Sequence, residues 1–213
     1  MAEHALHLEL TVPAGISGLI FDCDGTLADT LPLHYRAWEE GFAALGLACP
    51  QPFLVRHNGK PTEQILQLYN AEFGRQLDVA GFTARKEQRV HELLVDARPL
   101  EPVVALARHY QGRLPMAVVS GGTRANVERT LAAIGLRTLF AVVLTADDGL
   151  PPKPAPDLFL EAAARLGVAA TECQVFEDAD AGLEAARRAG MLATDVRPVV
   201  GGYPDPGRAR SSA

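Results

Sequence analysis

The sequence LIFDCDGTLADT, residues 19–30, joins an apolar run to two closely spaced carboxylates, a glycine and a threonine. The apolar run, extended to residues 18–23, predicts a short strand buried on both faces, as strands of parallel sheets are. Asp22 and Asp24 then stand at the carboxyl end of that strand, where open α/β sheets bind their ligands. This stretch therefore predicts both a parallel sheet and the place of the functional site on it.

The rest of the chain alternates short apolar runs with amphipathic stretches, which is typical of a parallel sheet wrapped by helices. Further strands are expected at residues 116–120, 141–144, 173–177 and 192–196. Helices are expected at residues 123–134, 156–166 and 179–189, each followed by a glycine that would end it. The predicted fold class is α/β, a Rossmann-like parallel sheet with helices on both faces.

About 90 residues separate the first two predicted strands, far more than the single crossover helix of a βαβ unit. This insert has helical patterns at residues 32–45, 62–73 and 81–95. We therefore predict three parts, which are a discontinuous α/β core at 1–31 and 98–197, an all-helical cap at 32–97, and a flexible C-terminal tail at 198–213.

Composition argues against several classes of function. The 213 residues carry 20 Lys and Arg against 26 Asp and Glu, so the net charge of −6 gives no basic stripe for nucleic acid. No apolar run reaches the ~18 residues that a membrane span needs. Three widely spaced cysteines, Cys23, Cys49 and Cys173, predict neither a disulfide framework nor a zinc site. We expect a cytoplasmic monomer with neither nucleic acid nor membrane as partner.

The two carboxylates of the opening stretch indicate a metal and a phosphate group. Asp22 and Asp24 would repel each other when buried unless a cation joins them, and Mg2+ prefers such oxygen ligands. Gly25 would allow backbone N–H groups to point at an anion, and Thr26 adds a hydroxyl. The alternative is an Asp-rich turn that only forms a loop.

Three later segments would supply the remaining groups of the site. Ser120 and Gly121 begin a glycine-rich turn before a helix, which suits phosphate oxygens. Lys153 lies between prolines in PPKPAPD and would neutralise both a carboxylate and a phosphoryl group, unless it is a solvated lysine. Glu177 and Asp178 would complete a metal site, or they are N-terminal caps of the next helix.

These segments, in this order, resemble the four motifs of the haloacid dehalogenase superfamily. The matching residues are Asp22-Cys23-Asp24-Gly25-Thr26, Ser120, Lys153 and Glu177-Asp178. The helical insert matches the position of that family's small cap. KPAPD and VFEDADAG resemble the beta-phosphoglucomutase-like branch, and RLPMAVVSGG with EDADAGLEAARRAGM is similar to small fructose-1-phosphate phosphatases that also accept 6-phosphogluconate.

The resemblance implies a role for each matching residue. Asp22 would be the nucleophile that forms an aspartyl-phosphate, and Asp24 the general acid and base. Mg2+ would be held by the carboxylates of Asp22 and Asp178 and the backbone carbonyl of Asp24, with Glu177 close by. The phosphoryl oxygens would be bound by Gly25, Thr26, Ser120, Gly121 and Lys153.

The resemblance also implies substrate contacts from the cap, at His34, Asn58, Gly59, Lys60, Thr62 and Lys86. Thr62 stands where the mutases have an arginine that grips a second phosphate, so that clamp is missing. His34 matches a histidine that couples Asp24 to sugar binding, or it is a linker residue. Lys86 matches a lysine that reaches toward the substrate, although a solvated helix face is the alternative.

Together these residues predict a Mg2+-dependent phosphatase that acts on a small phosphorylated sugar or sugar acid. A sugar phosphomutase is the first alternative, and a noncatalytic sugar-phosphate binding protein is the second.

Overall fold

The computed structural model describes residues 10–57 and 60–201. Its main sheet has five strands in the order β5-β4-β1-β6-β7, and each neighbouring pair is parallel. The strands are β1 (Gly18–Phe21), β4 (Met116–Val119), β5 (Val142–Leu144), β6 (Cys173–Glu177) and β7 (Leu192–Asp195). The predicted α/β class is confirmed, and β1, the strand of the opening stretch, lies at the centre of the sheet and is fully buried.

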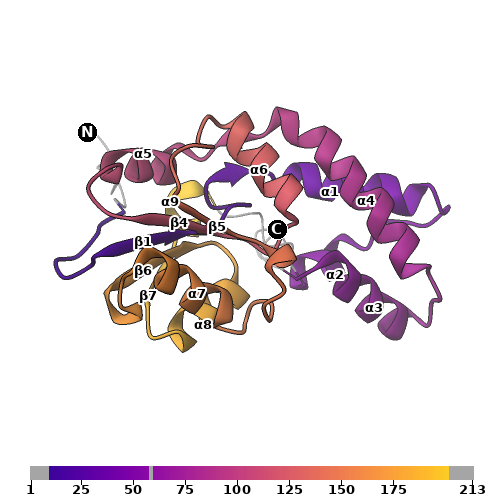
Figure 1. The fold of residues 1–213 in the computed structure, drawn as a ribbon. Coiled ribbons are helices and arrows are strands. Elements are labelled where there is room, and N and C mark those ends of the chain that lie inside the picture. Colours follow the sequence, from indigo (N-terminus) through magenta and orange to yellow (C-terminus); the bar gives the residue numbers. More distant parts are fainter. Residues whose placement is uncertain (1–9, 58–59, 202–213) are drawn as a thin grey trace, which may run out of the picture.

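Helices cover both faces of this sheet (Figure 1). Because side chains alternate along a strand, Leu19 and Phe21 face one apolar cluster while Ile20 faces the other. The first cluster includes side chains of α5 (Glu101–Tyr110) and α6 (Arg124–Ala133), and α9 (Arg197–Val200) packs against it. The second includes side chains of α7 (Asp157–Leu166) and α8 (Asp180–Arg188).

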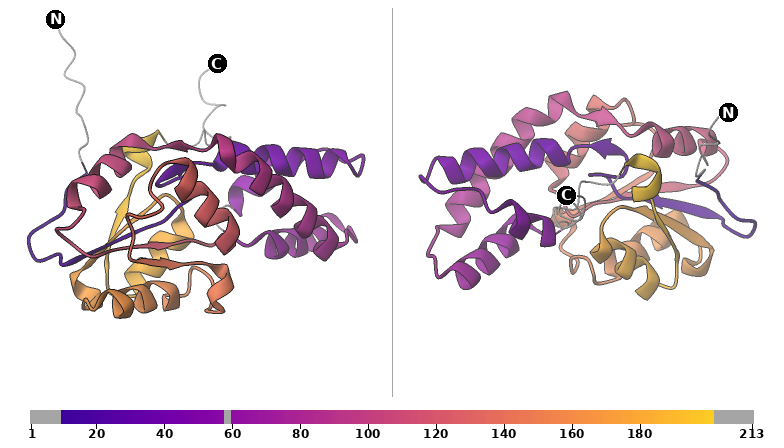
Figure 2. Two further views of the ribbon diagram at one scale, coloured as in Figure 1. Left: turned by 45° about the horizontal axis from the view of Figure 1, so that its top comes forward. Right: turned by 180° about the vertical axis from the view of Figure 1, so that it is seen from behind.

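Four α-helices make up most of the described part of the insert at residues 32–97, and they lie together beyond one end of the sheet (Figures 1 and 2). They are α1 (Leu31–Ala43), α2 (Gln51–Arg56), α3 (Thr62–Phe73) and α4 (Val79–Leu93). Their apolar side chains form a separate cluster that contains Trp38, Phe42 and Phe82. The antiparallel pair β2 (Ala28–Asp29) and β3 (Arg98–Pro99) brings the two ends of the insert side by side.

The predicted strands all exist, and their ends differ from the prediction by two residues or fewer. Helices α2 and α5 and the β2–β3 pair were missed, since each is short or contains proline, which weakens a periodic pattern. Residues 198–200, which the sequence assigned to the tail, form the end of α9, and residues 202–213 lie outside the described residues.

Three short 3-10 helices complete the described secondary structure. They are η1 (Leu94–Asp96), η2 (Ala146–Asp148) and η3 (Ala170–Glu172). None of the helices in the described part of the chain combines the length and apolar character needed to cross a bilayer.

Candidate active site

The predicted site residues of the core gather at the carboxyl edge of the sheet. Asp22 follows β1, Ser120 follows β4, and Glu177 and Asp178 stand at the end of β6. Lys153 reaches the same place from the loop before α7. These side chains line one wall of a cavity of about 390 Å³, and residues of α1, α3 and α4 line the opposite wall. Parallel strands ending at a common edge explain why segments far apart in sequence meet here.

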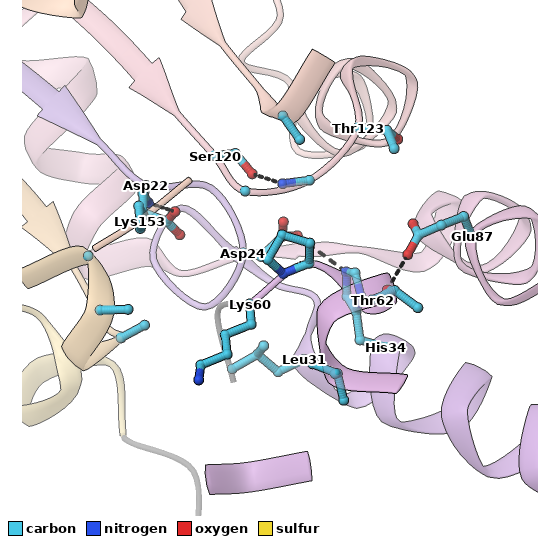
Figure 3. A pocket seen from close by; sticks show the side chains of 18 of the residues that line it. Asp22, Asp24, Leu31, His34, Lys60, Thr62, Glu87, Ser120, Thr123 and Lys153 are labelled. Atoms are coloured by element: carbon cyan, nitrogen blue, oxygen red, sulfur yellow. Dashed lines mark hydrogen bonds and ion pairs between the residues drawn. The ribbon is translucent and has the colours of Figure 1, made fainter. Parts of the chain in front are cut away.

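Lys153 ties together two buried carboxylates. Its Nζ donates hydrogen bonds to Asp22 Oδ1 at 2.6 Å and Glu177 Oε2 at 2.8 Å, and also to the Val119 carbonyl oxygen at 3.1 Å. Burial would lower the pKa of Lys153, but the two carboxylates outweigh it and raise that pKa. The ammonium is therefore held charged and fixed beside Asp22, and the alternative of a solvated lysine is wrong (Figure 3).

Three carboxylates at this edge form a group that would hold a cation. Asp22, Glu177 and Asp178 each offer one oxygen, and these oxygens lie within 4.8 Å of one another. Burial and the charge of Asp22 raise the pKa of Asp178 to about 7. Burial and the charge of Glu177 also raise the pKa of Asp22 well above its usual value. One ammonium cannot balance three carboxylates, so the oxygen ligands and the excess negative charge fit a divalent metal ion.

Gly25 and Thr26 lie against Asp178, one of these three carboxylates. Gly25 has a φ of +85°, and a Cβ there would overlap the carboxylate of Asp178, so only glycine fits. The Thr26 hydroxyl donates a hydrogen bond to Asp178 Oδ1 at 3.0 Å. Thr26 thus orients a carboxylate of the cluster in this structure, whereas a contact between its hydroxyl and a phosphoryl group stays a prediction.

Ser120 and Gly121 line the cavity in the turn between β4 and α6. The Ser120 Oγ accepts a hydrogen bond from the Gly122 backbone N–H at 3.0 Å (Figure 3). That bond fixes the side chain while leaving the hydroxyl hydrogen available to donate to a ligand. The arrangement suits the predicted contact with phosphoryl oxygens.

Asp24 lies apart from the carboxylate group and faces the insert. Its Oδ1 accepts a hydrogen bond from the Thr30 hydroxyl at 2.6 Å and lies 3.6 Å from His34 Nε2. Burial would raise the pKa of Asp24, but His34 and Thr30 outweigh it, so that pKa lies below its usual value. Asp22 and Asp24 are therefore placed in different surroundings, as two carboxylates with different tasks require. Thr30 was not singled out in the sequence, where it reads as an ordinary helix-start residue.

His34 is held by Lys86 from the cap side. The distance between Lys86 Nζ and His34 Nδ1 is 3.2 Å. Because an ammonium only donates, Nδ1 accepts, and the imidazole proton belongs on Nε2, facing Asp24. Lys86 is only 4% exposed, so the alternative of a solvated helix face is wrong for this residue. The linker alternative for His34 does not account for its contacts with Asp24 and Lys86.

Glu87 is a further residue of the site that sequence reasoning missed. Its Oε1 accepts hydrogen bonds from Thr62 Oγ1 at 2.7 Å and Lys86 Nζ at 2.9 Å, and Lys86 also donates to Thr62 Oγ1 at 3.1 Å. In the sequence, Glu87 is one of several charged residues of alternating sign on a helix. Only the packing of α4 shows which of these charged side chains face the cavity.

The remaining predicted cap residues divide into two groups. Lys60 lines the cavity, whereas Asn58 and Gly59 lie outside the described residues. Trp38 belongs to the apolar cluster of the insert and also lines the cavity, where Lys86 Nζ lies 5.4 Å from its ring centre.

Known proteins are similar to this chain in sequence and in fold. Residues 16–190 match the family model of haloacid dehalogenase-like hydrolases. The chain is 44% identical over 181 residues to fructose-1-phosphate phosphatase YqaB of Escherichia coli K12, covering 85% of this chain and 96% of that relative. It is 33% identical over 177 residues to hexitol phosphatase A of the same organism, covering 81% and 79%.

A solved structure agrees with these relatives. CbbY of Rhodobacter sphaeroides, a mutant in complex with xylulose-1,5-bisphosphate, superposes with a TM-score of 0.74 at 26% identity, covering 84% of each chain. The family match spans most of the chain and includes every predicted site residue of the core. The chain therefore belongs to the haloacid dehalogenase-like hydrolases.

Proposed function

We propose that the protein is a Mg2+-dependent phosphatase that hydrolyses small sugar phosphates of the fructose-1-phosphate or 6-phosphogluconate type. The observation that carries this proposal is the placing of Asp22. Its carboxylate lines the cavity, is held by Lys153 at 2.6 Å, and lies beside Asp178 and Glu177. Two relatives, one named a fructose-1-phosphate phosphatase and the other a hexitol phosphatase, support the same chemistry.

In the first step, an Asp22 oxygen attacks the phosphorus and the bond from phosphorus to the sugar oxygen breaks. Asp24 gives a proton to the departing oxygen, so the sugar leaves as an alcohol and not as an alkoxide. Lys153 and the Ser120 hydroxyl stabilise the charge on the phosphoryl oxygens. An aspartyl-phosphate on Asp22 is the product of this step.

In the second step, water attacks the aspartyl-phosphate while Asp24 accepts a proton from it. Inorganic phosphate leaves and the Asp22 carboxylate is restored. His34 and Thr30 outweigh burial and lower the pKa of Asp24, so the His34 contact must weaken and Asp24 must bind a proton from solvent before the first step. A sugar hydroxyl that enters between His34 and Asp24 would weaken this contact. The proton that Asp24 accepts from water in the second step then serves the next turnover.

The metal would be held by Asp22, Asp178 and the backbone carbonyl of Asp24, with Glu177 close to it. When bound, Mg2+ would neutralise part of the negative charge of the carboxylates and of the phosphoryl group. The raised pKa values of Asp22 and Asp178 support this need, because burial and a neighbouring carboxylate make it costly to ionise both groups without a further positive charge.

Residues 32–97 would act as a cap that covers the sugar and excludes bulk water. The separate apolar cluster of the insert and the cavity between insert and core support this division. The β2–β3 pair would be the hinge, because both crossings between the two parts pass through it.

Thr62 favours a phosphatase over a mutase. Its hydroxyl is bonded to Glu87 and Lys86, and a threonine cannot form the bidentate grip that arginine gives to a second phosphate. A bisphosphate would therefore be held weakly at its far end, and water would take the phosphoryl group in preference to a second sugar hydroxyl.

The proposal predicts phosphate release that depends on metal. After treatment with EDTA, the protein will release no measurable inorganic phosphate, and added Mg2+ will restore release from a panel of phosphorylated sugars, polyols and sugar acids. Formation of an isomer that depends on a bisphosphate would instead indicate a mutase. Binding without turnover would indicate a noncatalytic binding protein.

Asp24→Ala separates the acid role from nucleophilic attack. We expect the variant to lose about 10²-fold or more of its activity on sugar phosphates, because their alkoxides need a proton in order to leave. Activity on p-nitrophenyl phosphate will fall much less, since nitrophenolate leaves unprotonated. Initial rates of phosphate release from the two substrates give the comparison, and equal losses would contradict the acid role.

A further inference from the structure

The structure assigns Asn126, on the core helix α6, as a positioning residue. It holds in place the side chains of the insert that face Asp24. We propose that its side-chain amide fixes helix α4 of the insert in the orientation that Asp24 needs to protonate the leaving sugar. This inference rests on the proposed phosphatase function and extends it to a residue outside the four motifs.

Asn126 lies where the core and the insert meet. It is only 6% exposed and stands in the first turn of α6, directly after the turn that contains Ser120 and Gly121. The backbone N–H of Asn126 donates to the Thr123 hydroxyl that caps this helix, at 3.4 Å. Its position is therefore tied to the turn that would bind phosphate (Figure 3 labels Ser120 and Thr123 of this segment).

The side chain of Asn126 bonds two residues on one face of α4. Its Nδ2 donates to Glu87 Oε2 at 2.8 Å, and its Oδ1 lies 3.1 Å from His91 Nδ1. Because a carboxylate only accepts, Glu87 fixes the orientation of the amide, and His91 must then donate from Nδ1. Glu87 and His91 are four residues apart, so this one amide holds a full turn of α4 against the core.

Glu87 connects this contact with the acid and base of the proposed reaction. Its other carboxylate oxygen accepts from Lys86 Nζ at 2.9 Å. Lys86 Nζ in turn contacts His34 Nδ1 at 3.2 Å. A chain of polar contacts thus runs from α6 through the insert to His34, whose Nε2 has no hydrogen-bond partner among the described residues and lies 3.6 Å from Asp24 Oδ1.

A shift of Glu87 would displace the Lys86 ammonium and, through it, the His34 imidazole. Lys86 is buried and Glu87 is the carboxylate that neutralises it, so the ammonium would move together with Glu87. His34 would then lose the contact that orients its Nε2 toward Asp24. The transfer of a proton to the sugar oxygen depends on this geometry, whereas attack by Asp22 on phosphorus does not.

The test exchanges the amide at position 126 and the carboxylate at position 87, first by one substitution and then by both. In Asn126→Asp, two carboxylates face each other and repel, and we expect kcat/KM for the sugar phosphate to fall about 10- to 100-fold. Activity on p-nitrophenyl phosphate will stay within about threefold, as its leaving group needs no proton. Adding Glu87→Gln will restore part of the loss, because the introduced amide donates to the carboxylate now at position 126 while its oxygen still accepts from Lys86 and Thr62. The negative charge moves from position 87 to position 126, farther from the buried Lys86, so recovery stays incomplete.

Asn70→Asp is the matched control within the insert. The Asn70 amide bonds only the backbone of Leu77 among the described residues, through Nδ2 and Oδ1, away from the cavity. We expect this variant to lower the melting temperature. Its activities on the sugar phosphate and on p-nitrophenyl phosphate will keep the same ratio as in the wild type. Asn126→Asp would be merely structural if it lowered both activities alike, or if Glu87→Gln failed to restore the sugar phosphate activity, and either result would overturn the assignment.

Hydrogen exchange gives a readout that does not depend on activity. Backbone amides of α4, residues 79–93, will exchange faster in Asn126→Asp and return toward the wild-type rate in the double variant. Unchanged exchange would overturn the assignment even if the wild-type protein proved inactive on every ester. A wild-type protein without phosphate release, but with the expected exchange, would instead contradict the proposed function alone.

Discussion

Asp22→Asn will lower phosphate release from every substrate by at least about 10³-fold, including from p-nitrophenyl phosphate, because an amide oxygen is a poor nucleophile. This loss differs from that of Asp24→Ala, which spares substrates with good leaving groups. The change keeps the size of the side chain, and the pocket position of residue 22 is set by β1, so the fold will be retained.

Asp180→Asn is the matched control for Asp22→Asn. Asp180 belongs to the same acidic stretch as Glu177 and Asp178, but its side chain is 87% exposed and contacts Arg197 at 2.9 Å. Turnover by this variant will stay within about twofold of wild type, as is usual for surface substitutions. Retained turnover in Asp22→Asn, measured as inorganic phosphate after removal of wild-type contaminant, would rule out the covalent route.

Lys153→Met will impair both the reaction and the fold. Without the ammonium, Asp22 and Glu177 lose the buried cation that lies 2.6 and 2.8 Å from them. We expect a loss of about 10²- to 10³-fold in kcat, by analogy with the removal of one charge-stabilising donor. We also expect the free energy of unfolding to fall by about 3 kcal/mol, because breaking a buried ion pair leaves unpaired charge.

Two variants control for the loss of a lysine or of an ion pair. Lys153→Arg keeps the charge, but a planar guanidinium does not reproduce three bonds from one compact ammonium, so activity will remain low. Arg165→Met removes the exposed pair with Glu161 on α7 and a longer contact of 4.0 Å with Asp148, and will cost less than about 1 kcal/mol. Urea unfolding and initial rates measure both effects, and a Lys153→Met protein as stable and active as Arg165→Met would contradict this account.

The core of the site could be predicted from the sequence because its residues follow strands. An apolar run predicts a buried strand, and parallel strands end at one edge, so Asp22, Ser120 and Glu177 had to lie near each other. Lys153 was harder to place, since a loop residue has no periodic pattern, and only its motif assigned it to the site. Its three hydrogen bonds in the structure explain why that loop position needs a lysine.

The cap side could not be predicted to the same depth. Lys86 and Glu87 are adjacent on a helix rich in charges, and the sequence does not tell that both of them line the cavity. Asn126 belongs to a helix of the core, while its partners Glu87 and His91 belong to the insert. Contacts between two packed helices depend on how the two parts dock, and no local pattern encodes that docking.

Trapping of the phosphoryl group tests the central claim most directly. The protein, with Mg2+ and a sugar phosphate carrying labelled phosphorus, would be quenched in acid within milliseconds and digested. We predict label on the peptide that contains Asp22, lost on treatment with hydroxylamine as expected for an acyl phosphate, and no label in Asp22→Asn. Phosphate release at the wild-type rate with no labelled peptide, or with the label on another residue, would contradict the account.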